Sequence, residues 1–135
     1  MTEKLAHTMS TLFNRIILVD DDALTNMLNR KVIQSINPNM PVDVFLDIDD
    51  ALSFLKESDK DGASLILLDI NFPGKNGWDF LDAYQHFEKP SKIIMLSSSI
   101  ATEDQRKAKS HPLVLDYVTK PLSFEFIESI FPKRR

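Results

Sequence analysis

Three aspartates at residues 20–22 follow the apolar run 16–19, and a fourth, Asp69, follows the apolar run 65–68. A lone carboxylate is costly to bury unless an opposite charge or a metal ion lies beside it. Taken alone, aspartates at such positions also suit the start of a helix or a turn. The pattern therefore predicts either local caps or a charged site where buried strands end.

Short, β-branched apolar runs alternate with amphipathic stretches along residues 15–131. The runs predict five strands, and the amphipathic stretches predict five helices. The predicted strands are residues 15–20, 42–46, 64–69, 92–96 and 114–119, and the predicted helices are residues 23–36, 49–57, 77–87, 102–110 and 122–131. This strict alternation is typical of a doubly wound α/β fold, in which a sheet of five parallel strands carries helices on both faces.

The helical periodicity also predicts which side chains face the sheet. For the first helix these are Leu24, Met27, Leu28, Ile33 and Ile36, and for the last helix they are Phe124, Ile127 and Ile130 or Phe131.

In an open parallel sheet, functional groups gather beyond the carboxyl ends of the strands. Ser97 and Lys120 follow the fourth and fifth predicted strands, so we expect both beside Asp20, Asp21 and Asp69. At an effective dielectric constant of about 20, two like charges about 4 Å apart repel each other by about 4 kcal/mol. Lys120 supplies one compensating charge, and a hard divalent cation that takes oxygen ligands would supply two more. The sequence therefore predicts a Mg²⁺ site next to a lysine.

The composition argues against several functions. The chain has 135 residues, the size of one ordinary domain, and its lack of cysteine excludes disulfides and thiol catalysis. Its net charge of −4 argues against general binding to nucleic acid or to anionic membranes. No apolar run approaches the roughly 20 residues of a membrane span, so we expect a cytoplasmic protein that binds neither nucleic acid nor membrane.

Four motifs together resemble the receiver domain of two-component response regulators, which has a flavodoxin-like fold. They are VDDD at residues 19–22, LLDINFPGKNG at 67–77, LSSS at 96–99 and YVTKP at 117–121. Each motif is weak alone, but all four occur in order and each lies at a predicted strand end. The expected organisation is an N-terminal arm at 1–14, a receiver domain at 15–131 and a basic tail at 132–135. Because no output domain is expected to follow, the chain resembles the single-domain, chemotaxis-type regulators.

The resemblance implies a metal site and a phosphorylation site. Asp69 would be the phosphoacceptor, a carboxylate nucleophile that forms an acyl phosphate. Asp21 would bind Mg²⁺ directly, Asp20 would bind it through water, and the backbone carbonyl of Asn71 would complete the protein's ligands. Because Asn71 and Ser99 are small and polar, we expect water to reach the phosphoryl group and the phosphorylated state to be short-lived or intermediate in lifetime.

The resemblance also implies the groups that respond to phosphorylation. Ser97 and Lys120 would contact the phosphoryl oxygens and complete the catalytic set. The peptide bond between Lys120 and Pro121 would be cis. Tyr117 would be a switch that turns inward when Ser97 moves toward the phosphate, although its ring also suits an ordinary core position.

The function implied is that of a phosphoacceptor switch and not of a turnover enzyme. Its phosphate would come from a sensor histidine kinase or a histidine phosphotransfer domain. Its downstream partner would be a protein that the sequence does not identify, and residues 102–131 are the expected target surface.

Two other functions remain open from the sequence. In a haloacid-dehalogenase-like phosphatase, Asp20 would be the nucleophile and Asp22 the acid/base, and Ser97 and Lys120 would match the next two motifs. Leu24 stands where that family has Thr or Val, and no acidic pair follows on a further strand. The other alternative is a receiver-fold interaction module that is never phosphorylated, against which the complete set of site residues argues.

Overall fold

The computed structural model describes residues 13–71, 74, 76–98 and 101–131. The basic tail, Ser99 and residues 1–12 of the expected arm lie outside the described residues. Within them, five strands alternate with five helices. The strands are β1 (Arg15–Val19), β2 (Val42–Phe45), β3 (Ser64–Asp69), β4 (Lys92–Ser97) and β5 (Val114–Thr119). The helices are α2 (Ala23–Ile36), α3 (Ile48–Ser58), α4 (Gly77–Tyr84), α5 (Thr102–Lys109) and α6 (Phe124–Ser129).

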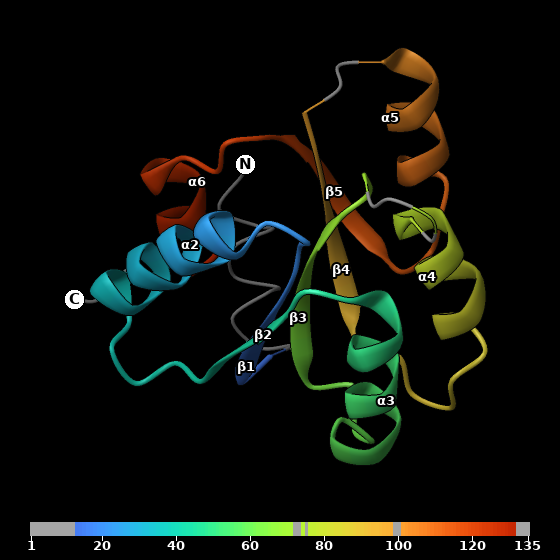
Figure 1. The fold of residues 1–135 in the computed structure, drawn as a ribbon, viewed down its shortest axis with the longest axis horizontal. Coiled ribbons are helices and arrows are strands. Elements are labelled where there is room, and N and C mark those ends of the chain that lie inside the picture. The colour runs from blue at the N-terminus through green and yellow to red at the C-terminus, as the bar shows by residue number, and fades with distance from the viewer. Residues whose placement is uncertain (1–12, 72–73, 75, 99–100, 132–135) are drawn as a thin grey trace.

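The five strands form one parallel sheet in the order β2-β1-β3-β4-β5. Figure 1 shows α2 and α6 on one side of this sheet and α3, α4 and α5 on the other. The predicted doubly wound α/β fold is confirmed. Because the strand order reverses between β1 and β3, the crevice beyond their carboxyl ends is where such a fold places its functional groups.

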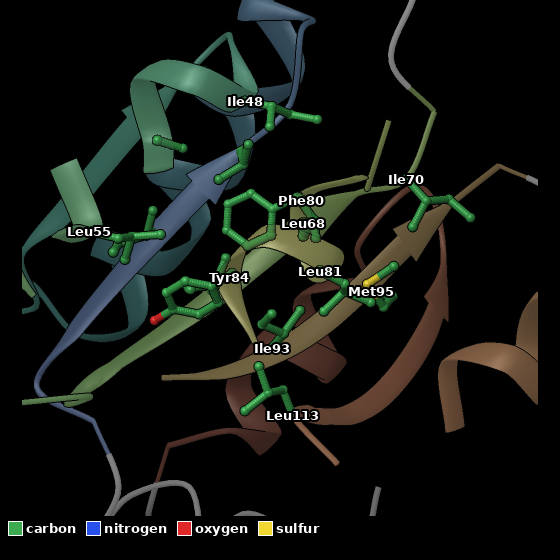
Figure 2. Packing of buried hydrophobic residues seen from close by; sticks show 14 of the residues in the cluster. Ile48, Leu55, Leu68, Ile70, Phe80, Leu81, Tyr84, Ile93, Met95 and Leu113 are labelled. Carbon is green, nitrogen blue, oxygen red and sulfur yellow. The ribbon is translucent and has the colours of Figure 1, made fainter. Parts of the chain in front are cut away.

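Alternate residues of the central strands supply two cores, because successive side chains of a strand point to opposite faces. Ile17 and Val19 of β1 pack with α3 and α4, whereas Ile16 and Leu18 pack with α2 and α6. Figure 2 shows the first core, in which the rings of Phe80 and Tyr84 lie among the aliphatic side chains of the sheet. Each fully buried aliphatic side chain contributes about 1.5–3 kcal/mol of transfer free energy, so the sheet is a rigid support for its loops.

Two helices are shorter than the sequence predicted. Helix α4 ends at Tyr84, and beyond it Phe87 N–H donates to the Tyr84 carbonyl three residues back, which is a tighter turn than an α-helix. Helix α6 begins at Phe124, because Ser123 is its N-cap and accepts a hydrogen bond from Phe126 N–H. The remaining helices and the strands agree with the prediction to within one residue at each end.

The predicted inner face of α2 was wrong in its first two turns. Leu24, Met27 and Leu28 are 58%, 46% and 51% exposed, and the side chains of this helix that are buried are Asn26 and Ile33. The start of the helix fixes this rotation, since Asp22 caps it and is itself tied to Asp20. Phe124, also expected to be buried, is 49% exposed in the first turn of α6.

Across the described ranges, no helix is long and apolar enough to cross a membrane.

Candidate functional site

Three carboxylates meet beyond the carboxyl ends of β1 and β3. Asp20 follows β1 directly, Asp69 is the last residue of β3, and oxygen atoms of Asp20, Asp21 and Asp69 all lie within 4.8 Å of one another. Asp20 and Asp69 are each 3% exposed, whereas Asp21 is exposed. The site therefore combines two buried carboxylates with one that solvent can reach.

Lys120, which follows β5, bridges the two buried carboxylates. Its Nζ lies 2.8 Å from Asp20 Oδ2 and 3.3 Å from Asp69 Oδ2. Three carboxylates beside one ammonium leave two negative charges uncompensated. An all-oxygen donor set with this excess of negative charge fits a hard divalent cation, so the residues present could hold a metal ion.

The pKa values of Asp69 and Lys120 reflect the excess of negative charge in the site. Burial raises the pKa of Asp69 above its ordinary value, and the nearby charge of Asp20 adds to this, although the Asn71 N–H and Lys120 oppose it. Burial works to lower the pKa of Lys120, but its hydrogen bond to Asp20 and the charges of both aspartates raise it overall. Lys120 therefore stays charged, while Asp69 is costly to ionise without further positive charge.

Backbone N–H groups hold the second oxygen of each buried carboxylate. Asp22 N–H donates to Asp20 Oδ1 across 2.9 Å, and Asn71 N–H donates to Asp69 Oδ1 across 3.0 Å. Each buried aspartate thus has one oxygen on a backbone N–H two residues later and the other on Lys120. This arrangement fixes both carboxylates in orientation without help from the exposed Asp21.

The loop after β3 returns closely to the sheet at the start of α4. Asn76 caps this helix in a reciprocal capping box with Asp79, and Gly77 N–H donates to the Ile70 carbonyl across 3.2 Å. A Cβ atom at position 77 would lie only 2.7 Å from the Ile70 Cα, so this approach requires glycine. The glycine therefore lets the loop close tightly beside Asp69.

Ser97 ends β4 and is fully buried, and it follows Leu96, which pairs with Asp69 in the sheet. Its hydroxyl group donates to Asn71 Oδ1 across 3.1 Å, and its carbonyl accepts from Lys120 N–H across 2.8 Å. The structure thus joins the ends of β4 and β5 to the loop that carries Asp69.

Tyr117 lies on β5 and is 8% exposed. Its ring belongs to the core that contains Met95 and Leu113, so it already points inward in this structure. The Lys120–Pro121 peptide bond is cis.

Asp22, which would be the acid/base of the phosphatase alternative, is the N-cap of helix α2. One carboxylate oxygen accepts from Leu24 N–H and Thr25 N–H, and the other accepts from the Thr25 hydroxyl group. Those hydrogen bonds lower the pKa of Asp22, which keeps it an acceptor and suits a helix cap better than a general acid.

Sequence reasoning missed Asn26, which lies beside the site on α2. Its side-chain amide donates to the backbone carbonyl of Asp20 across 2.8 Å. Two sequence signals could have found it: Asn26 comes one turn after the cap, and it precedes the buried Ile33 by seven residues, which places both on one helical face.

Comparison with known proteins identifies the family. The family profile described as "Response regulator receiver domain" matches residues 16–131. The chain is 30% identical over 110 residues to the transcriptional regulatory protein MalR of Bacillus subtilis, covering 82% of this chain and 45% of MalR. It is 32% identical over 122 residues to the two-component response regulator ARR14 of Arabidopsis thaliana, covering 87% of this chain and 30% of ARR14. The chain thus spans less than half the length of these relatives.

Solved structures agree with this result. A two-component response regulator from Cytophaga hutchinsonii superposes with a TM-score of 0.78 at 31% identity, covering 87% of this chain and 93% of that chain. The signal receiver domain of a LuxO-type repressor protein from Vibrio parahaemolyticus has the same fold, with a TM-score of 0.76 at 20% identity, over 87% of this chain and 86% of that chain. The chain belongs to the response regulator receiver domain family of two-component signalling.

Proposed function

We propose that this receiver domain is a Mg²⁺-dependent switch that accepts a phosphoryl group on Asp69. The observation that carries the proposal is the bridge of Lys120 between Asp20 and Asp69 at the reversal point of the sheet. It supports the proposal because two buried carboxylates, one ammonium group and the oxygens of Asp21 lie close together there. The donor is a phosphohistidine on a sensor histidine kinase or a phosphotransfer domain.

In the proposed transfer, a carboxylate oxygen of Asp69 forms a bond to phosphorus as the bond from phosphorus to the histidine nitrogen breaks. The bonding electron pair leaves with the imidazole. Phosphoryl transfer asks a protein mainly for position and for compensation of charge on the oxygens. The hydrogen bond from Asn71 N–H to Asp69 Oδ1 provides position, and Lys120 provides positive charge.

The proposed metal ligands are Asp20, Asp21, Asp69 and the backbone carbonyl of Asn71. Bound there, Mg²⁺ would neutralise charge on the transferring phosphoryl oxygens. Backbone N–H groups already hold Asp20 and Asp69, so these two carboxylates need no large rearrangement to bind it.

The response to phosphorylation begins with Ser97. A phosphoryl group adds about −1.5 to −2 charges and strong acceptor oxygens, and the Ser97 hydroxyl group is a nearby donor. To reach it, this hydroxyl group exchanges its hydrogen bond with Asn71 for one to the phosphate. The change passes to β5 through the Ser97 carbonyl and the Lys120 N–H, and we propose that residues 102–131 present it to a protein partner.

The protein acts on itself and not on an outside substrate. Asn71 is exposed beside Asp69, so water can approach the acyl phosphate and the proposed phosphorylated state is short-lived or intermediate in lifetime. We also propose that the protein is cytoplasmic, because the histidine kinase that would supply the phosphoryl group uses ATP.

Intact-mass measurement after incubation with acetyl phosphate tests the proposal. Wild type should gain one phosphoryl group only when Mg²⁺ is present, and Asp69→Asn should gain none. Asp61→Asn, which removes an exposed carboxylate from the turn before β3, is the matched control and should behave as wild type. A gain that persists in Asp69→Asn, or no gain in wild type under conditions where Mg²⁺ binds, would reject the proposal.

A further inference from the structure

Asn26 is a buried amide in the first turn of α2, directly behind the acidic turn. It is 2% exposed, and its Nδ2 donates to the backbone carbonyl of Asp20 across 2.8 Å. Its Oδ1 is fully buried and has no hydrogen-bond partner in the part of the chain that the structure describes.

Packing does not account for this residue. Asparagine is a poor helix former, and a buried carbonyl oxygen without a donor destabilises a fold. The next buried position on the same face is Ile33, which contacts the apolar core, so an aliphatic residue of similar volume would suit position 26 better. The hydrogen bond to Asp20 is therefore the contribution of Asn26 that an aliphatic side chain could not supply.

That hydrogen bond holds the peptide unit between Asp20 and Asp21. The next residue is also fixed, because Asp22 N–H donates to Asp20 Oδ1 and Asp22 caps the helix. The side chain of Asp21 makes no hydrogen bond or ion pair with another described residue, although one of its oxygens lies within 4.8 Å of oxygens of Asp20 and Asp69. The position of the Asp21 carboxylate is therefore set by the backbone of Asp21. Asn26, from helix α2, fixes the peptide unit that precedes Asp21 through its hydrogen bond to the Asp20 carbonyl.

We propose that Asn26 is a positioning residue that orients the Asp20–Asp21 peptide and thereby sets the affinity of the acidic cluster for a divalent cation. The inference rests on the proposed function, because it takes these carboxylates as the metal ligands. It assigns the role to a residue that touches neither the metal nor the phosphoryl group. Partners of metal ligands commonly change metal affinity by about 10–100-fold when they are removed.

Asn26→Leu tests the inference, with Mg²⁺ affinity measured by calorimetry and stability measured by thermal unfolding. The substitution removes the donor to Asp20 and also removes the unpaired Oδ1, so these two effects on stability oppose each other. We expect Mg²⁺ to bind about tenfold more weakly while the melting temperature stays within a few degrees of wild type. The amide resonances of Asp21 and Asp22 should also shift in the metal-free protein.

Ile33→Ala is the matched control on the same helix. It removes a fully buried side chain from the apolar core two turns away, so it should lower the melting temperature and leave Mg²⁺ affinity unchanged. This control shows whether Mg²⁺ affinity falls simply because the protein is less stable, or because the Asp20–Asp21 peptide has lost its hydrogen bond.

The outcomes separate the inference from the proposed function. If wild type binds Mg²⁺ and Asn26→Leu binds it equally well, the positioning role is wrong and the proposed function stands. If wild type does not bind Mg²⁺ at all, both are overturned. Weaker binding by Asn26→Leu at an unchanged melting temperature supports the inference.

Discussion

The hydroxyl group of Ser97 donates a hydrogen bond to the side-chain carbonyl of Asn71, and the two oxygen atoms lie 3.1 Å apart. Ser97 is fully buried at the end of β4. Asn71 lies two residues beyond Asp69, and the Asn71 N–H donates a hydrogen bond to the Asp69 carboxylate. A Ser97 hydroxyl group that moves to a phosphoryl oxygen has to give up this acceptor. In the proposed switch, the Asn71 side chain would therefore stabilise the unphosphorylated arrangement.

Asn71→Ala should favour the phosphorylated arrangement, because it removes that acceptor and leaves the backbone carbonyl in place. A neutral hydrogen bond contributes about 0.5–1.5 kcal/mol, so the population should shift by roughly two- to tenfold. Beryllofluoride, a stable mimic of the phosphoryl group, avoids the effect of Asn71 on hydrolysis. The variant should bind it more tightly in the presence of Mg²⁺, whereas Ser97→Ala should bind it more weakly, and Ser98→Ala, an exposed neighbour, should match wild type. Equal affinities for wild type and Asn71→Ala would show that this bond does not restrain the switch.

Lys120→Met should destabilise the protein and make its stability depend more strongly on Mg²⁺. The side chains of Asp20 and Asp69 are each 4% exposed, and removal of their shared ammonium leaves two buried charges without a partner. We expect a loss of about 2–4 kcal/mol in the free energy of unfolding at neutral pH, part of which millimolar Mg²⁺ restores. Urea unfolding with and without Mg²⁺ measures both effects.

Lys109→Met, at an exposed position on α5, is the control for loss of one positive charge and should change stability little. Equal losses in the two lysine variants would contradict the account of the charge balance.

Asp69→Asn should raise the melting temperature in the absence of Mg²⁺. The folded protein raises the pKa of this carboxyl group above its ordinary value of 3.8, chiefly by burial, so its ionised form opposes folding. For an acid with a raised pKa, that cost is absent below 3.8 and grows as the pH rises through the folded-state pKa. The difference between variant and wild type should therefore be present at neutral pH and disappear on acidification. A variant less stable than wild type at neutral pH would contradict this sign.

Tyr84→Phe tests a second buried network, at the opposite end of the sheet. Tyr84 OH accepts from Ser91 N–H across 2.6 Å, and the Ser91 hydroxyl group donates to Asp59 Oδ2 across 2.6 Å. Loss of the phenol oxygen leaves a buried N–H without an acceptor, which should cost about 1–3 kcal/mol at neutral pH. Urea unfolding at pH 7 measures this loss.

The alkaline range checks the same residue independently. Burial raises the pKa of Tyr84 above its ordinary value of 10.0, so wild type should lose stability as the pH rises above 10. Tyr84→Phe lacks this ionisation and should show a shallower decline between pH 10 and pH 11. If the stability of wild type and of Tyr84→Phe fell equally between pH 10 and pH 11, ionisation of Tyr84 would not contribute to the loss of stability, contrary to this prediction.

Much of the fold follows from patterns that depend on near neighbours in the chain. The apolar runs of β1, β3 and β4 are buried on both faces, so their sequences are continuous and easy to recognise. The carboxyl ends of parallel strands lie together by geometry, so the topology alone brings Lys120 to Asp20 across 100 residues of chain. The motifs could therefore predict the members of the site.

The rotation of α2 could not be predicted in the same way. The helix carries apolar residues around much of its surface, and the direction that faces the sheet is set by the hydrogen bonds of Asp20 and Asp22 at its start. Periodicity favoured the face of Leu24 and Leu28, whereas the structure buries Asn26. Likewise, the hydrogen bond between Ser97 and Asn71 depends on how closely the end of β4 approaches the loop after β3, which residue types alone do not determine.

The position of the covalent phosphate tests the central claim most directly. The protein is incubated with acetyl phosphate and Mg²⁺, treated with borohydride, which reduces an aspartyl phosphate to an alcohol, and mapped by tandem mass spectrometry. The account predicts that the reduced residue lies at position 69 and that none forms without Mg²⁺. A reduced residue at position 20, with position 69 unmodified, would contradict the account and identify Asp20 as the nucleophile.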